Sequence, residues 1–220
     1  KLEELWQRAD VMDDYINERF SYAFDDKYGY LTSFPTNVGT GLRACVVLHL
    51  PTLSQIRKFQ SIVGDMSRFG AAIRGLYGDG SENYGSLYEL SNQRTLGQSE
   101  KEIVELVMKA ASQLNNQEMR VRNATLNTQR LEREDEIYKS YGILKYARKI
   151  TEKDARIFLS QLMAGEEDGL VRFDRPCSLY KLMLGIKSAN LNLWARRPLD
   201  KEEMDTVRAA FIRENLPEIR

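Results

Sequence analysis

Several residue types that build common active sites are scarce in this chain of 220 residues. It contains two cysteines, Cys45 and Cys177, and one histidine, His49. Two cysteines form neither a disulfide framework nor a zinc-ligand spacing, and a single histidine nearly excludes histidine-based metal sites and Ser-His-Asp catalysis. Lysine plus arginine equals aspartate plus glutamate, at 32 each. The chain therefore has no net charge that favours nucleic acid or an anionic membrane surface.

Long apolar runs are also absent from the sequence. No run approaches the roughly 20 residues that span a bilayer. The first ten residues, KLEELWQRAD, have the spacing of an amphipathic helix and not of a signal peptide. We therefore expect a cytoplasmic protein without membrane or direct nucleic-acid partners, and a chain that begins inside a larger protein. At 42% hydrophobic residues, the chain is still able to bury a core.

The pattern of hydrophobic residues changes along the chain. β-type runs precede residue 91 and helical spacing follows residue 99, which predicts an α+β fold and not alternating βαβ units. Thr52 is an expected helix cap, and Ser99 with Glu102 forms a capping-box pattern. The run 42–50 is expected to be buried on both faces, with Cys45 in the core. The expected strands are 30–34, 42–50, 71–77 and 86–90, and the expected helices are 2–23, 52–69, 99–148 with a break near 111–116, 152–163, 178–193 and 201–215.

Three polar clusters stand at the ends of the expected strands. The first is the loop 36–41 followed by Arg43, the second is 74–82, and the third is 91–94. If these strands are neighbours in one sheet, three arginines and two carboxylates converge on one face. Arginine forks suit a polyphosphate, and a carboxylate suits a cationic partner or magnesium held through phosphate. Walker A and Rossmann patterns are absent, and ordinary turns with solvated arginines are the alternative interpretation.

The clusters carry a resemblance to a known family. Ser33-Phe34-Pro35-Thr36-Asn37-Val38-Gly39-Thr40-Gly41-Leu42-Arg43-Ala44 resembles the signature loop of the ATP:guanido phosphotransferases, the family of creatine and arginine kinases. Arg74-Gly75-Leu76-Tyr77-Gly78-Asp79-Gly80-Ser81-Glu82 resembles its second nucleotide-binding loop. Ser91-Asn92-Gln93-Arg94-Thr95-Leu96-Gly97 resembles the Ser-Asn segment that follows. Leu48-His49-Leu50-Pro51 and the helical last third are most similar to the bacterial branch, the protein-arginine kinases.

The resemblance implies a fold, a reaction and a set of site residues. The fold is a mainly antiparallel sheet with helices on one face over residues 1–125, followed by a helical C-terminal region over 126–220. The reaction is transfer of the γ-phosphoryl group of ATP to a guanidinium nitrogen, with Mg²⁺. Asp79 is expected near the guanidinium acceptor, and Phe34 occupies the position of the family's reactive cysteine. The nucleotide site is expected to include Arg43, Ala44, Cys45, Val46, Val47, Arg74, Gly75, Leu76, Tyr77, Gly78 and Asp79.

A last matching motif lies near the C-terminus. Met204-Asp205-Thr206-Val207-Arg208-Ala209 resembles a motif of the bacterial branch that forms a regulatory pocket for phosphoarginine. An ordinary surface ion pair between Asp205 and Arg208 is the alternative interpretation. The partners that the resemblance implies are ATP, arginine side chains of proteins, and a second copy of the chain or an activator protein.

Four departures from the family pattern predict impaired activity. Phe34 replaces the cysteine, Asp79 replaces a glutamate, and Met204 replaces the first arginine of the regulatory motif. The acidic stretch with the family's catalytic base, and the N-terminal portion that completes the ATP clamp, are expected upstream of Lys1. We therefore expect little transfer by this chain alone. A non-catalytic binding module, or a kinase for a small free guanidino compound, remains an alternative.

Overall fold

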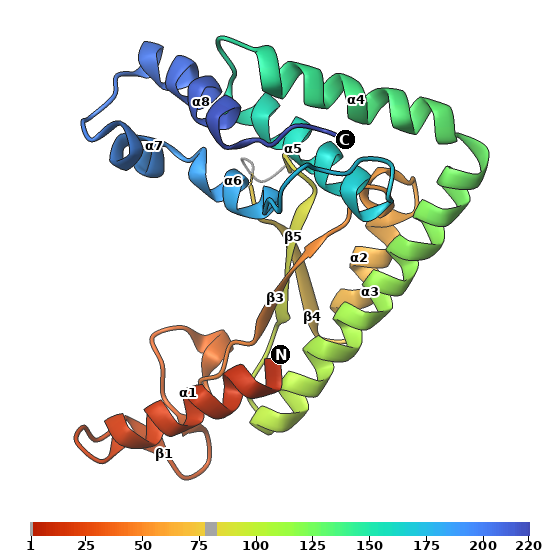
Figure 1. Cartoon of the computed structure of the whole chain (residues 1–220). Coiled ribbons are helices and arrows are strands. Elements are labelled where there is room, and N and C mark those ends of the chain that lie inside the picture. Colours follow the sequence, from red (N-terminus) through yellow and green to blue (C-terminus); the bar gives the residue numbers. More distant parts are fainter. Residues whose placement is uncertain (1, 78–82) are drawn as a thin grey trace. The chain divides into compact units, whose positions relative to one another are not determined.

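The structure is a computed structural model that describes residues 2–77 and 83–220 (Figure 1). The chain divides into two compact units. Residues 1–76 and 88–120 form the first, which we call the sheet unit, and residues 77–87 and 121–220 form the second, the helical unit. The described strands all lie before residue 93 and a series of helices alone follows from residue 100, so the predicted α+β class is confirmed.

The sheet unit contains a three-stranded sheet with the order β3-β5-β4. Strands β4 and β5 are antiparallel, with Ala71 opposite Asn92 and Arg74 opposite Glu89. A separate antiparallel hairpin pairs Phe24 of β1 with Tyr30 of β2. The elements are α1 (Leu2–Asn17), β1 (Phe24–Asp25), β2 (Gly29–Tyr30), β3 (Cys45–His49), α2 (Phe59–Arg68), β4 (Ala71–Gly75), β5 (Leu87–Asn92) and α3 (Glu100–Thr128), whose last turns belong to the helical unit.

Within the sheet unit, α2 and α3 lie on one face of the three-stranded sheet (Figure 1). On this face the ring of Phe59 in α2 packs edge-on against Tyr88 of β5, with centroids 5.1 Å apart. Ala44 packs with Ile103 and Val107 of α3 in a buried cluster. The other face carries the exposed residues Arg43, Cys45, Val47 and Arg74, and we call it the open face. The prediction that the run 42–50 is buried on both faces is wrong for this reason: exposed and packed residues alternate along it, as a half-covered strand requires.

Several predicted boundaries in the sheet unit are wrong. Helix α1 ends at Asn17 and not near residue 23, because the apolar spacing continues to Phe20 but Phe20 is exposed and no packing sustains the last turns. Thr52 does not cap a helix with its side chain. Instead the buried carboxylate of Glu118 accepts hydrogen bonds from the N–H groups of Thr52 (3.1 Å) and Leu53 (2.7 Å), and α2 begins only at Phe59.

The long helical pattern breaks later than predicted. Helix α3 runs unbroken through 111–116, because Leu114 continues its buried stripe, and the break lies at Gln129. The predicted capping box at its start is present, since Glu102 accepts from the N–H of Ser99 (2.7 Å) and Ser99 accepts from the N–H of Glu102 (3.3 Å). These hydrogen bonds to Ser99 lower the pKa of Glu102.

The helical unit is built from α4 (Arg130–Tyr146), α5 (Glu152–Glu167), α6 (Leu179–Gly185), α7 (Ser188–Ala195) and α8 (Lys201–Asn215). Helix α5 packs along α4, where a side chain on Gly165 would collide with Ile137. The predicted single helix over 178–193 is two helices, because Ile186 ends α6 and Lys187 precedes α7 with an extended backbone. Helix α8 has the predicted bounds, and a capping box of Asp200 and Glu203 starts it.

Among residues 2–77 and 83–220, none of the helices has the length and apolar character needed to cross a bilayer. Within the same residues, no group of three or more histidine, cysteine, aspartate or glutamate side chains is arranged to hold a metal ion.

Candidate nucleotide site

The signature loop is held tightly against neighbouring backbone. Gly39 and Tyr30 exchange two backbone hydrogen bonds, of 2.8 and 3.2 Å. Gly39 has a φ of +118°, and a Cβ there would lie 2.9 Å from the Cα of Leu96 and 3.0 Å from the carbonyl oxygen of Thr95. The buried Thr95 hydroxyl donates to the carbonyl of Val38 at 2.6 Å. Glycine at position 39 is therefore required by both backbone conformation and close approach.

The side chain of Asn92 connects this loop to the sheet. Its Oδ1 accepts from the N–H of Ala44 at 2.9 Å, and its Nδ2 donates to the carbonyls of Leu42 and Arg94, each at 3.1 Å. Asn92 is 9% exposed. A buried amide that bonds three backbone groups takes the place of ladder hydrogen bonds, which explains why β3 begins at Cys45 and not at the predicted residue 42.

The open face of the sheet carries two arginines on either side of a carboxylate. Arg43 lies just before β3 and donates to Glu89 of β5 at 2.5 Å. Arg74 of β4 stands directly opposite Glu89 in the β4–β5 register, so the two side chains share that face. Arg43 and Arg74 are both exposed. Sequence reasoning missed Glu89, although a charged residue within the apolar run Leu87–Leu90 was an available signal.

The predicted convergence of three clusters is only partly correct. Loop 36–41 and cluster 91–94 lie at one end of the sheet, where Asn92 bonds Leu42 and Ala44. Gly75 lies opposite Tyr88 at the other end of β4, about 14 Å away for a five-residue strand. The clusters are therefore at opposite ends of the sheet, and only Arg43 and Arg74 share a neighbour, Glu89 of β5, on its face. Gly78 and Asp79 lie outside the described residues.

The remaining predicted nucleotide-site residues are divided between the two faces. Cys45 and Val47 are exposed on the open face, so the prediction of a core Cys45 is wrong. Ala44 and Val46 pack toward the helices, so only their backbone can border a ligand on the open face. Gly75 is exposed, and Leu76 and Tyr77 are half-buried.

Phe34 is at the start of the signature loop with its side chain in solvent. It is 67% exposed, and its carbonyl accepts from the N–H of Asn37 at 2.9 Å and from the hydroxyl of Thr32 at 2.7 Å. The backbone of position 34 is thus fixed by the turn, while its side chain is free to face a ligand.

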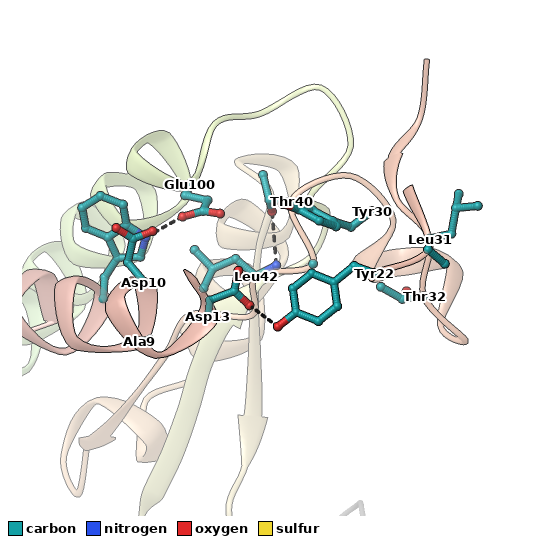
Figure 2. Close-up of a pocket in the computed structure, with 13 residues that line it drawn as sticks. Ala9, Asp10, Asp13, Tyr22, Tyr30, Leu31, Thr32, Thr40, Leu42 and Glu100 are labelled. Carbon is teal, nitrogen blue, oxygen red and sulfur yellow. Dashed lines mark hydrogen bonds between the residues drawn. The ribbon is translucent and has the colours of Figure 1, made fainter. Parts of the chain in front are cut away.

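A cavity of about 360 Å³ lies on the other side of the signature loop (Figure 2). Its wall includes Asp10, Asp13 and Glu100, and no lysine or arginine is among the described residues that line it. Glu100 accepts from the indole N–H of Trp6 at 2.7 Å, and Asp13 accepts from the hydroxyl of Tyr22 at 3.0 Å. Partial burial and Asp13 raise the pKa of Tyr22, which keeps it a donor. The carboxylates repel phosphate, so the lining of this cavity is unsuited to a nucleotide.

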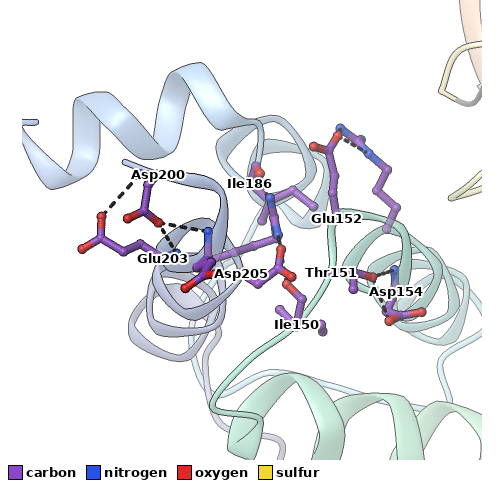
Figure 3. A network of polar contacts seen from close by, with 11 residues as sticks. Ile150, Thr151, Glu152, Asp154, Ile186, Asp200, Glu203 and Asp205 are labelled. Carbon is purple, nitrogen blue, oxygen red and sulfur yellow. Dashed lines mark hydrogen bonds and ion pairs between the residues drawn. The ribbon is translucent and has the colours of Figure 1, made fainter. Parts of the chain in front are cut away.

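The predicted regulatory motif lies on α8, and its arginine is buried. Arg208 is 3% exposed, donates to the carbonyls of Ile150 (2.9 Å) and Ile186 (3.2 Å), and pairs with Asp205 (Figure 3). The alternative of a solvated surface pair is therefore wrong for Arg208. The guanidinium joins α8 to the backbone before α5 and after α6. Among the other motif residues, Thr206 is exposed, Met204 and Val207 are half-buried, and Ala209 is buried.

Two family models together match nearly the whole chain. Residues 1–121 match the model of the ATP:guanido phosphotransferase C-terminal catalytic domain. Residues 128–220 match the model of the protein-arginine kinase McsB C-terminal domain.

Individual relatives agree with these models. The protein-arginine kinase of Caldanaerobacter subterraneus subsp. tengcongensis is 41% identical over 212 residues, which are 96% of this chain and 63% of the relative. That of Bacillus subtilis is 41% identical over 216 residues, 98% of this chain and 60% of the relative. The chain therefore spans about three fifths of the length of these relatives. The substrate-free duplicated taurocyamine kinase of Schistosoma mansoni, at 19% identity and a TM-score of 0.50 over 94% of this chain and 29% of that one, shares the fold.

Alanine substitutions at Gly39 and at Gly41 of the same loop test whether the close contact at Gly39 matters for stability. Gly41 also has a positive φ, of +70°, but a Cβ there has nothing within 4 Å. Gly39→Ala is expected to lower the free energy of unfolding by about 3 kcal/mol, because left-handed strain and overpacking act together. Gly41→Ala should cost only about 1 kcal/mol, from strain alone. Urea unfolding of both variants measures the difference, and equal losses would show that the contact with Leu96 is unimportant.

Proposed function

Because the chain belongs to the ATP:guanido phosphotransferase family, in its protein-arginine kinase branch, we propose that it carries the nucleotide-binding part of a kinase that phosphorylates arginine side chains of proteins. The observation that carries this proposal is the pair of arginines on the open sheet face. Arg43 and Arg74 flank Glu89 across neighbouring strands, and both arginines are exposed.

The charges of the open face suit a triphosphate. The Arg43–Glu89 ion pair is half-exposed. Exposed ion pairs contribute only about 0–1 kcal/mol to the stability of the folded state. A phosphate group of higher charge can therefore replace Glu89 as the partner of Arg43, with bidentate hydrogen bonds from both guanidinium groups. Mg²⁺ would be held through phosphate oxygens of the nucleotide, because it commonly takes phosphate and water ligands and few protein groups.

The reaction we propose is phosphoryl transfer to a guanidinium nitrogen. The bond between the γ-phosphorus and the bridging oxygen breaks and leaves ADP, a P–N bond forms, and the guanidinium loses one proton. Such a transfer depends on positioning and on neutralising charge. The two guanidinium groups on the open face neutralise charge on the phosphates. Asp79 is proposed to orient the acceptor guanidinium through a bidentate ion pair.

A protein acceptor is favoured over a small free guanidino compound. Residues 128–220 match the C-terminal domain of the protein-arginine kinase McsB, a region that the catalytic-domain model over residues 1–121 does not include. The same region contains Asp205 and the buried Arg208, and we propose that it serves regulation or acceptor recognition. A second copy of the chain or an activator protein stays a proposed partner.

One observation favours a second candidate, a binding module without transfer. Phe34 presents a phenyl ring to solvent where the family carries a cysteine, and a phenyl ring is unable to act as a thiolate; it offers only packing or stacking on a planar cation. Asp79 also has a shorter side chain than the family's glutamate. This candidate keeps the nucleotide site and predicts ATP binding without product.

The activity is tested by comparing this chain with one that carries the complete coding sequence of its gene. Each is incubated with ATP, Mg²⁺ and an arginine-rich protein, and acid-labile phosphate on the protein is measured. We expect transfer by the complete chain and little by the 220 residues alone. ATP binding without transfer by either chain would support the non-catalytic module. Absence of ATP binding by both would contradict the nucleotide site itself.

Phe34→Cys tests whether position 34 limits the chemistry. In the complete chain the substitution is expected to raise the transfer rate about tenfold or more, since a thiolate can polarise or hold the guanidinium and a phenyl ring cannot. Phe69→Cys is the matched control, because Phe69 is equally exposed, at 70%, and lies at the end of α2. An unchanged rate for Phe34→Cys, or an equal gain for Phe69→Cys, would contradict the assignment.

A further inference from the structure

Glu89 is a charged residue in the central strand of the three-stranded sheet. Its strand, β5, lies between β3 and β4, a position where glutamate packs less well than β-branched or aromatic residues. The neighbours of Glu89 on the same side of the strand, Leu87 and Ser91, are only 2% and 3% exposed. The side chain of Glu89 is 26% exposed. A carboxylate that is partly withdrawn from water in this way carries a desolvation cost that an apolar side chain would not.

Two arginines surround the carboxylate of Glu89, one toward β3 and one on β4. The Nη2 of Arg43 lies 2.5 Å from the Oε1 of Glu89, and Arg74 stands directly opposite Glu89 in the antiparallel pair. Side chains directly opposite each other start from Cβ atoms about 4.5–5.5 Å apart, so the charges of Arg74 and Glu89 interact. Two cations and one anion leave an excess of positive charge on this part of the open face.

The carboxylate of Glu89 stays close to a phosphate group that replaces it beside Arg43. Its backbone is fixed in the ladder between β4 and β5, so the negative charge is displaced from the guanidinium but not removed from the face. It then repels the phosphate oxygens, and this repulsion grows with the negative charge of the ligand. Because the side chain is only partly exposed, salt and water screen the repulsion less than between two fully solvated charges.

Mg²⁺ lowers this repulsion only as part of a complex with the nucleotide. As a divalent cation on the phosphate oxygens, it removes much of the negative charge of ATP. A bare Mg²⁺ ion is unsuited to the open face, because Arg43 and Arg74 repel it. Among residues 2–77 and 83–220, no group of three or more candidate side-chain ligands is arranged around an ion. The residues of this face therefore fit Mg²⁺ that is already held by phosphate.

We propose that Glu89 is a specificity-determining residue of the nucleotide site: its carboxylate discriminates against metal-free ATP and so favours the magnesium complex. The inference rests on the proposed function, in which Arg43 and Arg74 hold the phosphates. On their own, the two arginines attract the more highly charged free ATP more strongly. Glu89 opposes this preference, because its repulsion is also strongest for free ATP.

Glu89→Gln tests the inference through binding, without any need for phosphoryl transfer. Isothermal titration calorimetry of the complete chain gives one Kd for ATP in EDTA and one for ATP with excess Mg²⁺, both at the same ionic strength. We expect Glu89→Gln to lower the ratio of the Kd for free ATP to the Kd for the magnesium complex about tenfold. A purely structural role of Glu89 would change both Kd values by the same factor and leave their ratio unchanged.

Two further variants separate the charge of Glu89 from its packing. Glu89→Asp keeps the carboxylate, so the ratio should stay within about threefold of the wild-type value, whatever the shorter side chain does to the contact with Arg43. Asp65→Asn is the matched control. It also removes a carboxylate paired with an arginine, Arg68 at 3.1 Å, but Asp65 belongs to α2, which packs on the covered face of the sheet. Its ratio should stay within about twofold of wild type.

Three results would overturn the inference. They are an unchanged ratio in Glu89→Gln, a fall in Glu89→Asp as large as that in Glu89→Gln, or an equal fall in Asp65→Asn. If the wild-type complete chain binds both forms of ATP and one of these results is found, only the role of Glu89 is wrong. If the wild-type chain binds neither form, the proposed nucleotide site fails, and the role of Glu89 fails with it.

Discussion

The buried amide of Asn92 is the contact on which the candidate site depends. It bonds backbone groups of Leu42, Ala44 and Arg94, and so fixes where the signature loop ends and where β3 begins. Thr95, three residues further along, holds the same loop through the carbonyl of Val38. Because the side chains of Asn92 and Thr95 are buried, loss of either one would leave backbone groups without a hydrogen-bond partner. The position of Arg43 follows from this junction, since it is bracketed by two of the bonded residues.

The second constraint is that the sheet has one covered face and one open face. Helices α2 and α3 cover one face with Phe59, Ile103 and Val107, and strand alternation then forces every second residue outward. Arg43, Cys45 and Val47 share the outward side for this reason, together with Arg74 and Glu89. A polyphosphate site on this face therefore needs no cavity, only a set of outward side chains and a fixed loop. The cavity on the other side of the signature loop, with its carboxylates, is unsuited to the same ligand.

Much of the fold was predictable from local signals. Helix α8 has its predicted bounds because a strong cap begins it, and Arg197 strengthens that cap by holding the pKa of Glu203 down to about 2. The capping box at Ser99 and the approximate positions of β3, β4 and β5 along the chain were likewise visible in residue patterns. The motifs that identify the family lie in loops, where side-chain identity is constrained by backbone contacts such as those of Gly39.

The features that the sequence pattern did not predict depend on contacts between residues that are far apart in the chain. The apolar pattern of 42–50 predicts a strand that is buried on both faces. Cys45 is exposed because α2 and α3 pack on one face only. Glu118 delays the start of α2 from 66 residues away in sequence. Arg43 and Glu89 lie 46 positions apart, so their ion pair exists only in the folded sheet unit and gives no motif in the sequence.

The most direct test of the open-face nucleotide site is protection of the Cys45 thiol. Cys45 is exposed beside Arg43, while burial raises the pKa of Cys177 and makes it a slow internal reference. Alkylation of each thiol by iodoacetamide is followed by mass spectrometry with and without ATP and Mg²⁺. The account predicts that ATP slows the reaction of Cys45 and not that of Cys177. It also predicts that Arg74→Met requires about tenfold more ATP for the same protection. Unchanged reactivity of Cys45 at saturating ATP would contradict the account.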